Sequence, residues 1–294
     1  MQPTLRPTLR QSKPLDLSFG WTWFPKTWTL FSKAPWPIFG FALLGGFITL
    51  AISIVPVLGK VVSGFFYPLL LGGGIRVLST IDSGRAVDMA DFFAPLTDRA
   101  LFRRYLPMCL TCGALMLGTA IISGVLIVSL GLGGLASQGT SMPSLPGGLP
   151  GGLPGTVMLT LVGTLVTLVM SLVMAILCLY GPALVDLEGA SSKEGMEQSL
   201  VLTSRNWLPF LVLGFVYLLP ALVFLLPGGL LALASVAGAM PWLLTFVVSG
   251  LGALMTFVFM LPISFCMPYI IYKESFPSTE PTAAPSPVLN QPPL

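Results

Sequence analysis

Residues 183–214 read ALVDLEGASSKEGMEQSLVLTSRNWLPFLVLG. This stretch leaves one apolar run, crosses a charged segment, and enters the next apolar run through Arg205, Trp207 and Pro209. Ser191 and Glu194 have the spacing of a capping box, in which each residue bonds a backbone amide of the other at the start of a helix. The stretch therefore predicts a short amphipathic helix that leads directly into a long apolar one.

The composition is that of a membrane protein. Of the 294 residues, 54% are hydrophobic and 9% are charged, whereas soluble domains carry about 25% charged residues. There is no histidine, so the commonest general base and metal ligand is missing. The net charge is only +3. From the composition as a whole we expect no nucleic-acid partner, no cofactor, no metal site and no catalytic residues.

The apolar runs predict six spanning helices, because about 20 apolar residues cross a ~30 Å hydrocarbon core. The second run is the weakest, because Gly72-Gly73-Gly74 and Arg76 crowd its end. We expect one integral membrane domain over 17–272, a flexible Gly/Pro loop over 131–155, and disordered ends at 1–16 and 273–294. The predicted spans are about 37–58, 61–79, 106–130, 156–181, 208–234 and 242–271.

The basic residues predict the orientation of these spans. Of the 14 Lys and Arg residues, all but Lys60 fall in the termini or in the loops after the second and fourth spans. Positive charge collects in cytoplasmic segments. The sequence therefore predicts six spans with both termini in the cytoplasm.

Three copies of one unit organise the chain. Pro37, Pro107 and Pro209 stand at the entrances of the first, third and fifth spans, where proline is tolerated in a first helical turn. A base lies four residues before each proline and an aromatic residue one or two before it. This pattern predicts an all-α protein of three hairpins, each preceded by an amphipathic helix in the cytoplasmic interface. Its interfacial anchors are Lys33 and Trp36, Arg103 and Tyr105, and Arg205 and Trp207.

Several short motifs carry a resemblance to a known group. They are Gly20-Trp21 with Phe31 and Pro35, IVPVLG at 54–59, GPALV at 181–185, Glu188-Gly189, Ser199, and RNW at 205–207. Over about residues 17–272 the chain resembles an uncharacterised group of bacterial six-helix inner-membrane proteins. That group is related in style to the membrane domain found beside glycerophosphoryl diester phosphodiesterases. The resemblance implies an inner-membrane location and no established activity.

Charged groups inside apolar segments are costly and often functional. Arg76, Asp186 and Glu188 are the candidates, and all lie near the cytoplasmic ends of predicted spans. Arg76 either snorkels to headgroups while the acids sit in a loop, or it pairs with Asp186 in a polar cytoplasmic vestibule. The Cys109-x-x-Cys112 spacing and the triple glycine are both interpreted as helix packing.

Three functional classes remain open at this point. The favoured one is a non-catalytic interaction or accessory protein, whose partners are the lipid bilayer and a membrane protein complex. The second is a carrier or lipid-handling transporter for an apolar or amphiphilic substrate. An intramembrane enzyme is the weakest, because the sequence lacks histidine and membrane-embedded acids.

Overall fold

The computed structural model describes residues 15–55, 58–137, 153–236 and 242–276. All regular elements in these ranges are helices, as predicted, and one short helix precedes two long helices three times in succession. The helices are α1 (Phe19–Lys33), α2 (Pro35–Ser53), α3 (Leu58–Asp82), α4 (Met89–Thr97), α5 (Arg99–Ser137), α6 (Leu153–Leu187), α7 (Ser192–Arg205), α8 (Trp207–Val236) and α9 (Trp242–Ser275).

Local capping explains where several of these helices begin. The capping box of Ser191 and Glu194 at the start of α7 is confirmed. Asp98 accepts hydrogen bonds from the amides of Ala100 at 2.8 Å and Leu101 at 3.3 Å, so α5 begins at Arg99. The predicted entrance at Pro107 is therefore wrong, because that proline lies inside a helix that its aspartate cap starts eight residues earlier.

Five of the described helices are long and apolar enough to cross a membrane. A sixth is reached if α7 and α8, which meet at an angle of 82°, are counted as one bent span. Helices α5 and α6 extend into both ends of the predicted loop 131–155. Their 39 and 35 residues correspond to about 58 and 52 Å, well beyond a ~30 Å hydrocarbon core.

The predicted terminal segments lie mostly outside the described residues. At the N-terminal end, the amide of Leu15 donates a 3.0 Å hydrogen bond to Oδ1 of Asn206. At the other end α9 continues to Ser275, and Phe276 is buried. The described residues thus include Leu15 and Asp16 at one end and residues 273–276 at the other.

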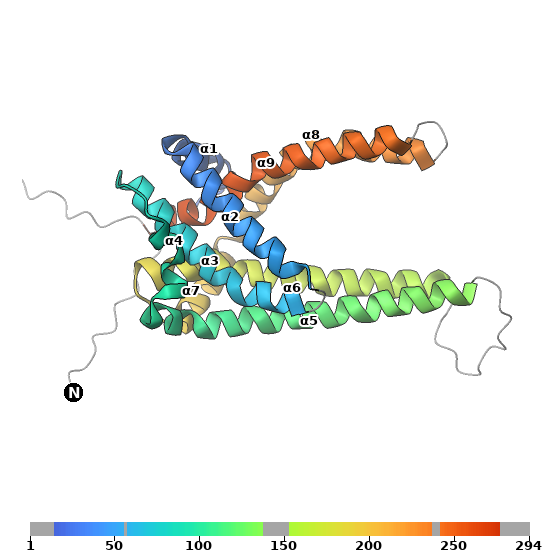
Figure 1. The fold of residues 1–294 in the computed structure, drawn as a ribbon, viewed down its shortest axis with the longest axis horizontal. Coiled ribbons are helices and arrows are strands. Elements are labelled where there is room, and N and C mark those ends of the chain that lie inside the picture. Colours follow the sequence, from blue (N-terminus) through green and yellow to red (C-terminus); the bar gives the residue numbers. More distant parts are fainter. Residues whose placement is uncertain (1–14, 56–57, 138–152, 237–241, 277–294) are drawn as a thin grey trace, which may run out of the picture.

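The three short helices lie toward one end of the molecule, opposite the C-terminal end of α5 (Figure 1). Each of them packs against two long helices. Helix α4 packs on α3 and α5, α7 packs on α6 and α5, and α1 packs on α8 and α9. In Figure 1 the α5–α6 and α8–α9 pairs run away from this end in diverging directions.

Glycines in the middle of α3 allow the closest helix contacts. A Cβ atom on Gly72 would lie 2.1 Å from the hydroxyl of Tyr105 in α5, and one on Gly73 would lie 1.9 Å from the carbonyl oxygen of Phe92 in α4. On Gly74 it would lie 2.7 Å from the ring of Phe265 in α9. The packing role predicted for this triple glycine is confirmed, because it brings three neighbouring helices against α3.

Candidate functional site

Arg76 and Asp186 form a two-point ion pair between α3 and α6. Nε and Nη2 of Arg76 donate to the two carboxylate oxygens of Asp186 at 3.0 and 2.9 Å. The Asp186 side chain is 1% exposed and that of Arg76 is 35% exposed. A bidentate guanidinium–carboxylate pair fixes both groups in orientation as well as distance. The pair lines a polar cavity of about 370 Å³ together with Arg85 and Asp91.

Glu188, the third predicted residue of the vestibule, forms a hydrogen bond with α9. Its Oε1 accepts a 2.6 Å hydrogen bond from the hydroxyl of Tyr272 in α9. Gly189 follows with a φ of +70°, a conformation in which glycine is favoured, and it turns the chain away after α6. The structure therefore brings Arg76 and Asp186 together, while Glu188 connects α6 to α9.

A second cluster at the same end centres on Asp82, the last residue of α3. Nζ of Lys33 in α1 lies 2.6 Å from Oδ1, while Lys273 and Tyr269 of α9 both donate to Oδ2. A further ion pair joins Lys26 to Glu274 at 2.7 Å. Together these contacts attach α1 and α9 to the end of α3.

The predicted interfacial anchors divide into two groups. Trp36 and Trp207 are 81% and 57% exposed, Arg103 and Arg205 are exposed, and Lys33 is engaged with Asp82. Tyr105 is wrong as an anchor, because it is fully buried and its hydroxyl donates to the carbonyl oxygen of Pro182 at 2.9 Å. It is held inside because the side chain fits against Gly72 of α3.

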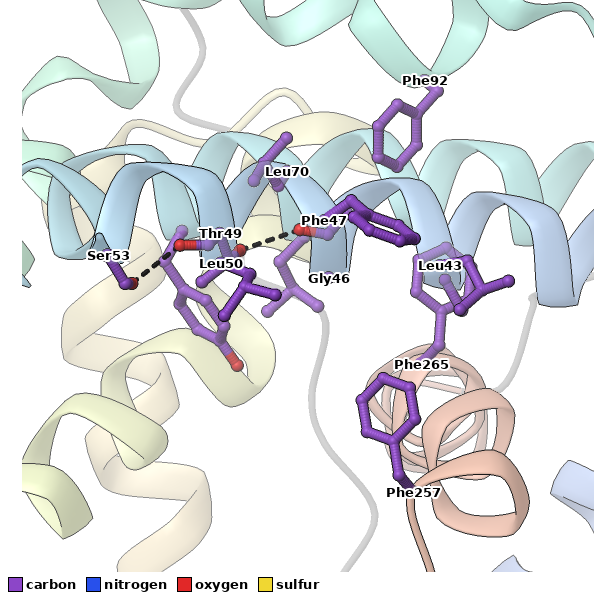
Figure 2. Close-up of a pocket in the computed structure, with 14 residues that line it drawn as sticks. Leu43, Gly46, Phe47, Thr49, Leu50, Ser53, Leu70, Phe92, Phe257 and Phe265 are labelled. Carbon is purple, nitrogen blue, oxygen red and sulfur yellow. Dashed lines mark hydrogen bonds between the residues drawn. The ribbon is translucent and has the colours of Figure 1, made fainter. Parts of the chain in front are cut away.

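An apolar cavity lies between α2, α3, α4 and α9, and we call it the lateral cavity (Figure 2). Its volume is about 620 Å³. Phe47, Leu50 and Phe257 line it and are 50–66% exposed, so the cavity reaches the outer surface of the helices. Its other lining side chains include Ala42, Leu43, Leu70, Leu71, Phe92 and Phe265.

Three side chains with hydroxyl groups line the lateral cavity: Tyr67 of α3, and Thr49 and Ser53, which bond within α2. The Thr49 hydroxyl donates to the carbonyl oxygen of Gly45 at 2.8 Å, and that of Ser53 donates to the carbonyl oxygen of Thr49 at 2.7 Å (Figure 2). Such bonds within a helix leave little capacity for a polar ligand. The lateral cavity is therefore chemically suited to a hydrocarbon chain.

The cysteines stay in the packed interior. Cys112 and Cys178 place their sulfur atoms 3.5 Å apart between α5 and α6, as free thiols. Within the described residues no group of three or more His, Cys, Asp or Glu side chains is placed to hold a metal ion. The sulfur contact contributes to the packing of α5 on α6.

Sequence reasoning missed Asp82 and the lateral cavity. Asp82 carried a usable signal, because a carboxylate at the C-terminal end of a helix is disfavoured by the helix dipole and calls for a basic partner. The lateral cavity has a weaker signal in the sequence: Ala42 and Gly46 are small residues four positions apart, a spacing typical of close helix contacts. Both line the cavity, and a Cβ on Gly46 would lie 3.9 Å from Leu261 of α9.

These features define the class of protein. It is a helical, membrane-spanning protein whose described charged contacts lie at one end. A family model described as a domain of unknown function, DUF7847, matches residues 29–271. The chain therefore belongs to that family. Searches of curated proteins and of solved structures find no match.

Proposed function

We propose that this chain is a non-catalytic, multi-pass protein of the inner membrane that organises lipids by admitting an acyl chain to the lateral cavity. The observation that carries the proposal is the chemistry of that cavity: about 620 Å³ of space lined almost wholly by aliphatic and aromatic side chains. Ligand sites in proteins have volumes of ~300–1,000 Å³. Lipid is the apolar ligand that every membrane-spanning surface meets.

The lateral cavity is also accessible from the side that would face lipid. Phe47 and Leu50 project from α2 and are both about two-thirds exposed, which is normal for side chains in contact with acyl chains. An acyl chain could enter between them without crossing a layer of polar side chains. A carrier would use the same cavity but would also move lipid between membranes or leaflets, so a lipid-transfer assay separates the two functions.

Three repeated units are part of the proposal. Each would consist of an interfacial helix and a hairpin, with α8 as a full sixth span and both termini in the cytoplasm. This arrangement is supported by the packing of each short helix against two long helices: α1 against α8 and α9, α4 against α3 and α5, and α7 against α5 and α6. We also retain the relation to the membrane domain of glycerophosphoryl diester phosphodiesterases as a proposal from the shared motifs.

The acyl-chain site predicts a loss of bound lipid when the cavity is filled. Gly46→Leu puts four carbons into the lateral cavity from a position where a Cβ meets only an ordinary contact at 3.9 Å. We expect at least a fivefold drop in lipid that survives gentle detergent extraction, read by native mass spectrometry. Gly40→Leu is the matched control, because it lies on the same helix, lines no part of the cavity and has nothing within 4 Å.

Equal lipid retention by the Gly46 and Gly40 variants would overturn the acyl-chain site. The same spectra test the other form of the accessory function, binding to a membrane protein complex. A stoichiometric protein partner would appear in them as added mass. That form is favoured by the exposed Trp21 and Trp28 on α1, which face away from the buried residues Trp23 and Thr27. A protein partner retained with no lipid would make protein assembly the better description.

The proposed orientation predicts which residues are accessible from outside the cell. In a cysteine-free background, a cysteine replacing Gly139 should react with an impermeant thiol reagent in intact cells. A cysteine replacing Lys193, whose side chain is 81% exposed on α7, should react only after the membrane is opened. The reverse pattern of labelling would place both termini outside the cytoplasm.

A further inference from the structure

A second cavity lies next to the lateral cavity, at the start of α2 and the end of α3. Its volume is about 600 Å³, and Lys33, Pro37, Phe41, Asp82 and Arg85 are among the residues that line it. We propose that this cavity holds the anionic headgroup of a phospholipid whose acyl chain occupies the lateral cavity. The inference rests on the proposed function and adds to it the class of lipid that is selected.

Residues of α2 line both cavities. Pro37 and Phe41 line the headgroup cavity, and Gly45, Thr49 and Ser53 line the lateral cavity. These five residues recur at intervals of four, so each lies about 40° around the helix from the one before, and the lining winds gradually around α2. The distance from Gly45 to Ser53 along the axis is about 12 Å. This is within the ~15 Å that one leaflet contributes to the hydrocarbon core.

Helix α3 is antiparallel to α2 and repeats the same order. Asp82 and Arg85 lie beside the headgroup cavity, whereas Tyr67, Leu70 and Leu71 lie beside the lateral cavity. The two cavities along these helices therefore provide a charged end and an apolar remainder. A phospholipid has this same division along its length.

The boundary between the two cavities is a pair of aromatic rings. Phe41 lines the headgroup cavity and Phe92 lines the lateral cavity, with ring centroids 5.3 Å apart. Phe92 is fixed in place because its backbone packs directly against Gly73 of α3. A bound lipid would have its glycerol backbone at the level of this pair, between its charged and its apolar parts.

The charges at this end favour an anion. Lys33 and Arg85, which line the cavity, carry two positive charges, and Asp82, which Lys33 and Lys273 both contact, carries one negative charge. Arg85 also lines the polar cavity of Asp91 and Asp186. The Nε of Arg85 donates to the Ser83 hydroxyl at 2.9 Å, and among the described ion pairs none involves Arg85. An exposed guanidinium binds a phosphate through two parallel hydrogen bonds. Arg85 is therefore the principal ligand, with Lys33 beside it.

The test uses the full chain reconstituted in vesicles with equal amounts of phosphatidylglycerol and phosphatidylcholine that carry the same acyl chains. After gentle extraction, native mass spectrometry gives the ratio of the two lipids retained. We expect the wild type to retain phosphatidylglycerol preferentially and Arg85→Gln to lower that ratio about fivefold, the effect of one basic residue on an anionic lipid. Arg85→Lys should preserve most of the preference, and Lys193→Gln, an exposed base on α7, should leave it unchanged.

The outcomes separate this inference from the proposed function. An unchanged ratio in Arg85→Gln, or no preference in the wild type, overturns the headgroup assignment, while loss of lipid in Gly46→Leu still supports the acyl-chain site. Full retention of lipid by Gly46→Leu overturns both. A lower ratio in Arg85→Gln, with the total amount of bound lipid unchanged, supports a headgroup site that selects lipid without holding the acyl chain.

Discussion

Replacing Arg76 by alanine is expected to destabilise the protein by about 3 kcal/mol, the cost of leaving a buried charge without its partner. Asp186 would remain 1% exposed with neither of the two hydrogen bonds that it accepts from Arg76. Asp186→Ala should cost less, because the freed guanidinium is already 35% exposed and can reach water or headgroups. Arg76→Ala should therefore destabilise the protein more than Asp186→Ala.

Thermal unfolding of the purified protein in detergent measures this order. The double variant Arg76→Met/Asp186→Leu should recover most of the stability lost in Arg76→Ala, because apolar side chains of similar size replace the whole pair. Lys193→Ala is the control: its ion pair with Glu197 is 3.9 Å long and both side chains are mostly exposed. Surface pairs contribute about 0–1 kcal/mol. Additive losses in the double variant would show that the two residues do not act as a pair.

The apolar runs and their spacing were enough to predict a helical membrane protein and the positions of its long helices. The helix limits were less predictable, because they depend on single capping groups. Asp98 starts α5 at Arg99. The shared pattern of a basic and an aromatic residue before Pro37, Pro107 and Pro209 therefore overstated how alike the three entrances are. A proline marks a helix start only when no cap lies further upstream.

Charge was the best guide to the polar contacts. Arg76 and Asp186 were recognised because ionised groups inside apolar runs need partners, and the structure brings the two together. Tyr105 was misassigned for a general reason: an aromatic residue beside a basic one suits both a lipid interface and a buried site. Only the contact with Gly72, which is 33 positions away in the sequence, decides that it is buried.

The lateral cavity could not have been read from the sequence. It exists because α2, α3 and α9 come together at certain angles, and no residue that lines it is unusual for a membrane helix. The pattern of Phe41, Gly45 and Thr49 at intervals of four is visible in the sequence, but it is equally typical of a face in contact with lipid. Distinguishing a cavity from a lipid-facing surface requires the positions of the neighbouring helices.

Replacing Gly73 by alanine is expected to have the largest effect of any single methyl group added to this protein. The new Cβ would lie 1.9 Å from the carbonyl oxygen of Phe92 and 2.8 Å from its carbonyl carbon, so the backbone of α4 must move. We expect a loss of about 3 kcal/mol, at the upper end for overpacking. Because Phe92 lines the lateral cavity, we also expect less retained lipid.

The neighbouring Gly74 provides the sharpest comparison for this prediction. A Cβ there meets the ring of Phe265 at 2.7 Å, so Gly74→Ala should be rescued by trimming that ring in Phe265→Ala. Gly73→Ala should not be rescued by Phe92→Ala, because the obstructing atoms belong to the backbone and remain. Gly118→Ala, which has nothing within 4 Å, should be neutral or up to ~1 kcal/mol more stable, since alanine favours the helix. Unfolding temperatures of the variants test this prediction. If Gly73→Ala unfolds at the same temperature as Gly118→Ala, then α4 is not held against α3 at Gly73.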